Sequence, residues 1–312
     1  MHGSVHAEVA SAGRPGSPMN RFRVAREVWA LVRDAVKSWI DDYAPSMGAA
    51  LAYYTMFSIA PLLLIVIAVA GLAFGEQAAR GEIVSQLRTL MGEDGARAVE
   101  ALLVSVKVGG TGIVGTLGGV FMLLVGATTV FAELQNAMDR IWRAPERANE
   151  GGVWTLLRTR LLSLGMIMGI GFLLVVSLVV SAGLAALARW WGPLFGDARA
   201  LACALDFGLS FVIVTSAFAM IYKWMPRVRL HWRDVWTGAA VTALLFTIGK
   251  MLIGTYLGSS GISSGFGAAA SLVVMVVWVY YSAQVFLLGV EFTRLYAMRY
   301  GSLRERSESG PH

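Results

Sequence analysis

Polar side chains recur at helical spacing inside three of the most apolar stretches of this 312-residue chain, and they are the residues best placed to do chemistry. A polar or ionisable group inside a bilayer is costly, and it usually faces a partner or a path along which a solute, an ion or a proton can move. Residues three or four apart share one face of a helix. The candidate lining residues of such a path are Tyr54, Ser58, Pro61, Glu133, Asn136, Gln284 and Glu291.

The stretch "DDYAPSMGAALAYYTMFSIAPLLL" (41–64) carries the first of these polar faces. Tyr54 and Ser58 are four residues apart, and Tyr54 lies about 9 Å inside the predicted span at 1.5 Å per residue. Pro61 lacks an N–H and crowds the preceding turn, so we expect it to free the Phe57 carbonyl and to kink the helix. The stretch therefore predicts a spanning helix whose first half is polar on one side.

Two other apolar stretches carry polar faces at a similar depth. Glu133 and Asn136 share one helix face in the stretch 113–139. Gln284 and Glu291 share one helix face in the stretch 268–293. A charged or amide group that faces lipid costs about 2–3 kcal/mol on insertion scales, so we expect the three faces to turn toward one another. The sequence thus predicts a polar cavity open to the cytoplasm. The alternative is structural, with Glu133 bonded to a tyrosine or an arginine and Glu291 paired with Arg294.

The remaining charged residues near the spans have simpler interpretations. Asp41 and Asp42 precede the first polar face, where helix capping and the helix dipole explain both. Lys250 lies about 21 Å from the cytoplasmic edge of its stretch. Asp206 lies near the opposite edge of its own stretch, at a similar depth in the membrane. We therefore predict an intramembrane ion pair between Lys250 and Asp206, with snorkelling of the lysine as the alternative.

Six long apolar helices must position these residues. The chain is 56% hydrophobic and 15% charged, with a mean hydropathy of +0.63, whereas soluble domains carry about 25% charged residues. Each apolar stretch has about 20 residues or more, which lets a helix cross a hydrocarbon core of ~30 Å. The sequence predicts an all-α polytopic membrane protein with transmembrane helices at 48–74, 113–139, 159–188, 201–222, 236–257 and 268–293.

The distribution of basic residues predicts the topology. Segments on one side of the six stretches hold 19 Lys and Arg residues, and those on the other side hold 6. Because basic residues concentrate in cytoplasmic segments, both termini are expected in the cytoplasm.

The segments outside the spans have distinct compositions. Residues 1–20 are rich in Gly, Ser, Ala and Pro and read as a disordered tail, as do residues 301–312. Residues 21–40 predict a basic amphipathic helix on the cytoplasmic surface, before a transmembrane domain at 41–300. Residues 76–107 predict an extracytoplasmic helical hairpin between the first two spans, broken at "GEDG".

Several function classes lack the residues that they need. The four histidines are His2, His6, His231 and His312, and they form no cluster with carboxylates that a metal-dependent nuclease requires. The chain has no phosphate-binding loop of the G-x-x-x-x-G-K type. Its basic residues concentrate in the segments predicted to be cytoplasmic, and this distribution does not indicate a groove that binds nucleic acid. We therefore expect no enzyme, no cofactor, no metal and no nucleic-acid partner.

Three stretches of the chain carry a family resemblance: "DDYAPSMGAALAYYTMFSIAPLLL", "FAELQNAMDRIW" and "GAAASLVVMVVWVYYSAQVFLLGVEFTRLYA". They resemble the signature stretches of the YihY/BrkB family of bacterial inner-membrane proteins, over about residues 30–300. The resemblance implies a six-span helical fold and a location in the bacterial cytoplasmic (inner) membrane. This family has carried a "ribonuclease BN" label and a link to serum resistance, and some members are associated with export or lipid handling.

These observations favour a transport protein for a small solute, an amphiphile or a lipid, with a polar cavity facing the cytoplasm. The alternative is a non-catalytic membrane scaffold or envelope assembly factor. The two differ in one property, since transport requires a solvent-reachable cavity and a scaffold has a solid core in which every polar group is paired. Membrane lipids are expected partners in both cases, and the sequence permits a homo-oligomer.

Overall fold

The computed structural model describes residues 18–107, 113–144, 161, 165–166, 168–169, 171–173, 198–228, 230–259 and 270–304. The described residues form helices and no strand. The helices are α1 (Pro18–Asp41), α2 (Ala44–Phe74), α3 (Glu76–Lys107), α4 (Ile113–Ile141), α6 (Ala198–Trp224), α7 (Trp232–Ser259) and α9 (Ala270–Arg299). The all-helical fold class is therefore confirmed for this part of the chain.

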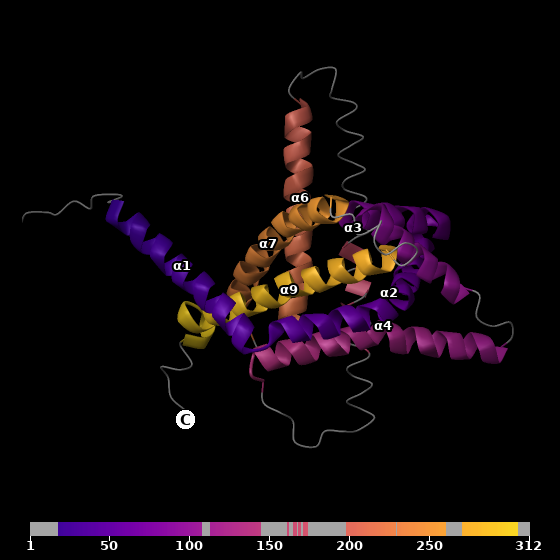
Figure 1. The fold of residues 1–312 in the computed structure, drawn as a ribbon, viewed down its shortest axis with the longest axis horizontal. Helices are drawn as coiled ribbons and strands as arrows, with labels where there is room; N and C mark the ends of the chain where they lie inside the picture. The colour runs from indigo at the N-terminus through magenta and orange to yellow at the C-terminus, as the bar shows by residue number, and fades with distance from the viewer. Residues whose placement is uncertain are drawn as a thin grey trace, which may run out of the picture.

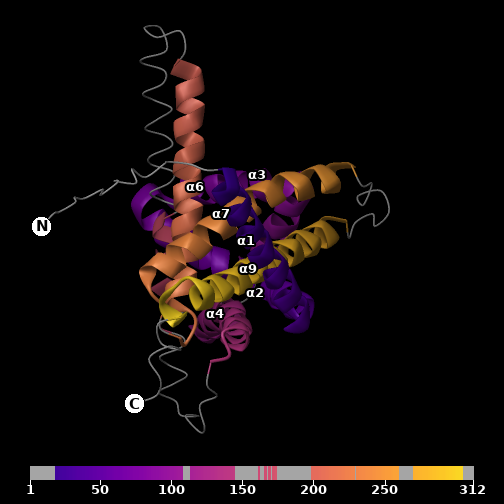
Figure 2. The ribbon, with the colours of Figure 1, turned by 90° about the vertical axis from the view of Figure 1, so that its left-hand side faces the viewer.

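Helices α2, α9 and α7 pack side by side with alternating direction (Figures 1 and 2). Close approach of α7 and α9 depends on glycine, because a Cβ at Gly238 would clash with Thr293 and one at Gly249 would clash with Tyr281. Helix α4 lies on the outer side of α2, where Gly126 faces Pro61. Helix α6 crosses α7 obliquely and extends beyond the bundle (Figure 1).

The main core joins five helices near the end where α9 finishes. Its fully buried members come from all five of α2, α4, α6, α7 and α9, with Ala44 from α2, and α2 adds Met47 and Leu51. They include Met138, Ile141, Tyr222, Val235, Leu287 and Val290. The Tyr222 hydroxyl is satisfied inside this core, 2.8 Å from Thr242 Oγ1 and 3.2 Å from the Phe286 carbonyl oxygen, to which it donates.

Helix α3 is a hairpin that packs on α2 and α9 (Figure 1). Its backbone leaves the helical conformation at Gly92, where φ is 78° and ψ is 178°, a region that favours glycine. The break lies at the first residue of the "GEDG" sequence that predicts it. Apolar residues on both arms, among them Met91, Val99 and Leu103, form a second core with Ile67 and Met275.

Two carboxylates hold the connecting segments at the end of the bundle where α9 finishes, opposite the α3 hairpin. Asp139 of α4 accepts a hydrogen bond of 2.9 Å from the Arg227 backbone N–H and lies 3.1 Å from its Nε. Asp234 at the start of α7 accepts bonds of 3.0 and 2.7 Å from the backbone N–H and hydroxyl of Ser302. Residues 301–304, placed by the sequence in a disordered tail, therefore continue the fold past α9 as a helical turn, which corrects that prediction.

Four described helices are long and apolar enough to cross a membrane: Ala44–Leu72, Phe207–Trp224, Trp232–Ile253 and Ala270–Arg299. They correspond to the predicted spans at 48–74, 201–222, 236–257 and 268–293. The predicted span at 113–139 forms α4, which is not among the four, and the one at 159–188 falls largely outside the described residues. The protein is thus polytopic, while six spans and two cytoplasmic termini stay predictions.

Candidate functional site

A buried ionic cluster lies where the α1–α2 turn meets the last part of α9. Arg294 Nη2 donates hydrogen bonds to Glu291 Oε2 at 3.0 Å and to Ser38 Oγ at 2.5 Å, and it lies 3.6 Å from Asp42 Oδ2. Arg294 Nε also donates to Glu291 Oε2, at 3.2 Å. Glu291 is 0% exposed and Arg294 is 6% exposed. One guanidinium therefore joins α1, the turn and α9.

The turn that places Asp42 has an unusual backbone. Tyr43 precedes α2 with φ 57° and ψ 33°, in the left-handed region that residues with a Cβ rarely adopt. Tyr43 occupies the N-cap position of α2 with no side-chain cap hydrogen bond. The capping role expected of Asp42 is therefore wrong, because its carboxylate turns to Arg294. Asp41 is the exposed last residue of α1.

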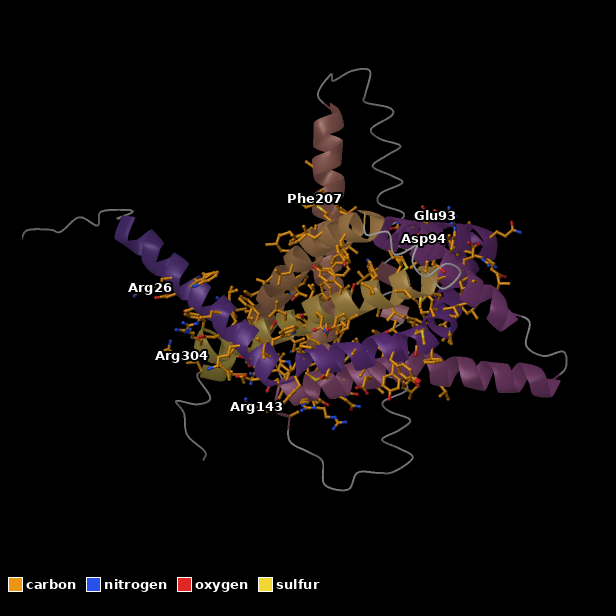
Figure 3. The ribbon with its side chains drawn as sticks, viewed as in Figure 1. Arg26, Glu93, Asp94, Arg143, Phe207 and Arg304 are labelled. Carbon is orange, nitrogen blue, oxygen red and sulfur yellow. The ribbon has the colours of Figure 1, made fainter. Side chains whose placement is uncertain are left out.

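The cluster lies at the end of the bundle that carries Arg26, Arg143 and Arg304, which we call the basic end (Figure 3). Glu93 and Asp94 of the α3 hairpin lie toward the other end in the same view.

Gln284 continues the polar face of α9 away from the basic end. Its Nε2 donates to the Pro45 carbonyl oxygen of α2 at 3.3 Å, and its side chain fills the space beside Gly48. Gln284 and Glu291 are seven residues apart and share one helix face; Gln284 contacts the first turn of α2, and Glu291 lies beside Asp42 in the turn before it. That the two residues line one site stays a prediction.

Several buried polar atoms on α2, on α9 and in the turn before α2 have no hydrogen-bond partner within the described part of the chain. They are Asp42 Oδ2, Ser58 Oγ, Trp278 Nε1, Gln284 Oε1 and Glu291 Oε1. We call these five residues the α2–α9 polar seam. An unsatisfied buried polar group costs about 1–3 kcal/mol, so native proteins ordinarily supply such groups with water or a ligand.

Pro61 and Ser58 lie where α2 meets other helices. Ser58 is 1% exposed, and the Pro61 ring packs against Gly126 of α4. The Phe57 carbonyl, which Pro61 deprives of its helical donor, also faces Gly126, 3.8 Å from the place that a Cβ would take there. The small residue on α4 therefore accommodates both the proline ring and the freed carbonyl.

The other predicted lining residues are arranged differently. Tyr54 is 36% exposed, and its ring packs edge-on against Tyr53 at 5.6 Å between centroids. On α4, Asn136 is exposed and Glu133 is partly buried. No hydrogen bond or ion pair among the described residues joins these three side chains to Gln284. Their convergence with Gln284 into one cavity stays a prediction.

The predicted Lys250–Asp206 pair also stays a prediction. Lys250 is partly buried in α7, whereas the side chain of Asp206 in α6 lies outside the described residues.

Sequence reasoning missed two members of the cluster, Ser38 and Asp42. The sequence did indicate Arg294 as a partner of Glu291, because it follows Glu291 by three residues and therefore lies on the same helix face. Ser38 and Asp42 precede Arg294 by about 250 residues, and spacing along the chain gives no signal for such a contact. Among the described residues, no group of His, Cys, Asp or Glu side chains is placed to hold a metal ion.

Apolar helices of spanning length around buried polar contacts define a helical, multi-pass membrane protein. The chain belongs to the family described as virulence factor BrkB, whose model matches residues 35–311, so the family predicted from the sequence is confirmed.

Several curated proteins named UPF0761 membrane protein are similar to this chain. A UPF0761 membrane protein of Pseudomonas aeruginosa (strain LESB58) is 28% identical over 253 residues, which cover 80% of this chain and 59% of the relative. One from Alkalilimnicola ehrlichii is 27% identical over 312 residues, 98% of this chain and 66% of the relative. One from Tolumonas auensis is 30% identical over 177 residues, 56% of this chain and 55% of the relative. The chain thus spans about six tenths of the length of these relatives, and no solved structure matches it.

Proposed function

We propose that this protein is a transport protein that moves a small solute or an amphiphile across, or within, the bacterial inner membrane along the α2–α9 polar seam. In this proposal both termini are cytoplasmic, the seam opens at the basic end, and the protein catalyses no reaction. The observation that supports it is the set of buried polar atoms along the seam whose hydrogen-bonding capacity no described residue meets.

The pairing of polar groups favours transport over a scaffold. A solid scaffold core would pair its polar groups as Tyr222 is paired, whose hydroxyl lies in two hydrogen bonds. In the seam, Gln284 donates through Nε2 to the Pro45 carbonyl oxygen and leaves its Oε1 without a partner among the described residues. Such half-used groups are suited to exchange partners with a passing solute.

The charges of the cluster indicate which solutes it would bind. Asp42 and Glu291 bring two carboxylates to the single guanidinium of Arg294. The two carboxyl groups also lie within hydrogen-bond reach of each other, so the site either shares a proton between them or holds one negative charge that Arg294 does not balance, and an unbalanced buried charge is costly. A cation or a solute rich in hydrogen-bond donors would reduce that cost, so we assign the site to solutes of this chemistry.

Cysteine accessibility tests the proposal. In a background with Cys203→Ser, the variants Gln284→Cys and Ser58→Cys would be treated with a membrane-impermeant maleimide applied from the cytoplasmic face of inverted vesicles. The matched control is Leu287→Cys, because Leu287 is 0% exposed in the apolar core of the same helix. We expect labelling at the two seam positions and none at Leu287. Seam positions as inert as Leu287 would contradict transport and favour the scaffold.

A further inference from the structure

Helix α1 presents an apolar stripe that no described helix covers. Its members are well exposed, with Trp29 at 70%, Ile40 at 58% and Val28 at 53%. The stripe consists of Val28, Trp29, Val32, Val36 and Ile40. Four of these residues recur at intervals of four, so with 3.6 residues per turn they lie along one side of the helix.

A different side of α1 holds it to the bundle. Leu31 and Ala35 are buried at 5% and 2% exposure, and Ser38 bonds Arg294. Helix α1 packs on α9 and extends beyond the bundle in Figures 1 and 2. The apolar stripe is therefore additional to the packing face and is not needed to attach α1.

Charged residues are sorted by sign around the stripe. Three exposed basic residues lie along the border of the stripe: Arg26, Arg33 and Lys37. Their spacing at 3.6 residues per turn places them there. The acidic residues lie on the side nearer α9, where Asp34 pairs with Arg299 at 3.7 Å. A row of cations beside an apolar stripe fits a surface that is anionic at its boundary and apolar beneath.

We propose that the stripe of α1 docks into the cytoplasmic leaflet of the membrane and that Arg26, Arg33 and Lys37 bind the headgroups of anionic phospholipids. Amphipathic helices with a basic border bind membranes in this way, with their apolar face inserted at the boundary between headgroups and acyl chains. Each basic residue near an anionic surface strengthens the attachment. Docking of this kind is independent of whether the polar seam transports a solute.

The test uses full-length protein in proteoliposomes, with one environment-sensitive fluorophore attached at Val32→Cys in the Cys203→Ser background. Vesicles of phosphatidylcholine are compared with vesicles of phosphatidylcholine and phosphatidylglycerol, each with brominated acyl chains as quenchers. Leu252→Cys, 64% exposed in α7, is the lipid-facing control. Asp41→Cys, exposed on another side of α1, is the water-facing control.

We expect bromolipid quenching at Val32 to approach that at Leu252 in anionic vesicles and to be weak at Asp41. Replacing Arg26 and Lys37 together by Gln should lower the ratio of quenched to unquenched label at Val32 about tenfold or more. The proposal is overturned if aqueous iodide quenches Val32 and Asp41 equally in both lipid mixtures. It is also overturned if Val32→Cys forms disulfides between copies of the chain without bromolipid quenching, because a second copy would then cover the stripe.

Discussion

Removing the guanidinium of Arg294 is the most informative single change in this protein. Glu291 is 0% exposed, and its Oε2 accepts two hydrogen bonds from that guanidinium, at 3.0 and 3.2 Å. Arg294→Met would keep much of the side-chain length and leave the Glu291 carboxylate buried without a counter-ion. Stranding one partner of a buried pair typically costs about 3–5 kcal/mol, and we expect a loss of this size in the free energy of unfolding.

The measurement is the midpoint of SDS-induced unfolding in mixed micelles, with two companion variants. Arg299→Met removes a similar side chain from the Asp34 pair, whose side chains are 47% and 40% exposed, and it should cost about 0–1 kcal/mol. The double change Arg294→Met with Glu291→Gln strands no glutamate charge, so it should be milder than Arg294→Met alone.

Two outcomes would refute this reasoning. If Arg294→Met costs no more than Arg299→Met, Glu291 is not a buried anion that depends on this guanidinium. If the double change is as damaging as the sum of the two single changes, the residues do not act as a pair, since paired residues show non-additive effects.

Packing and charge at other positions yield further expectations. Gly238→Ala should destabilise the protein by about 1–3 kcal/mol in the same unfolding assay, because the new methyl group would overlap Thr293. Adding Thr293→Ala to this variant should restore much of the lost stability. Equal losses with and without Thr293→Ala would refute the contact. Lys250→Met and Asp206→Asn should each reduce stability, and the double change should be milder than their sum if the predicted intramembrane pair exists; additive effects would leave Lys250 as a snorkelling residue.

The spanning helices were predictable because bilayer thickness and hydrophobic runs determine them locally. The predicted spans at 48–74 and 268–293 correspond to α2 and α9, which extend a few residues further toward the basic end. The hairpin break was predictable for a similar reason, since Gly92 supplies a backbone conformation that other residues rarely adopt. In each case a short window of sequence contains the physical cause.

The ionic cluster was only partly predictable, because its geometry depends on a turn that the sequence does not announce. Glycine, Asn or Asp is the usual signal for a left-handed residue, yet Tyr43 takes that conformation here. The turn directs Asp42 to Arg294, so a residue expected to cap α2 becomes part of a site with α9. The depth of Gln284 and Glu291 could be read from helical spacing, whereas their partners on α1 and α2 required the structure.

Helix α1 links the two proposals physically, because it bears the apolar stripe on one side and Ser38 on another. The hydrogen bond from Arg294 to Ser38 and the ion pair from Arg294 to Asp42 hold the end of α1 against the end of the seam. A helix behaves as a rigid rod over a few turns, so lipid contacts that hold Val32 and Val36 also restrict the position of Ser38. Loss of those contacts should therefore increase the access of water-soluble reagents to Gln284→Cys. Unchanged labelling of Gln284→Cys in the Arg26→Gln and Lys37→Gln background would show that surface docking and the seam act independently.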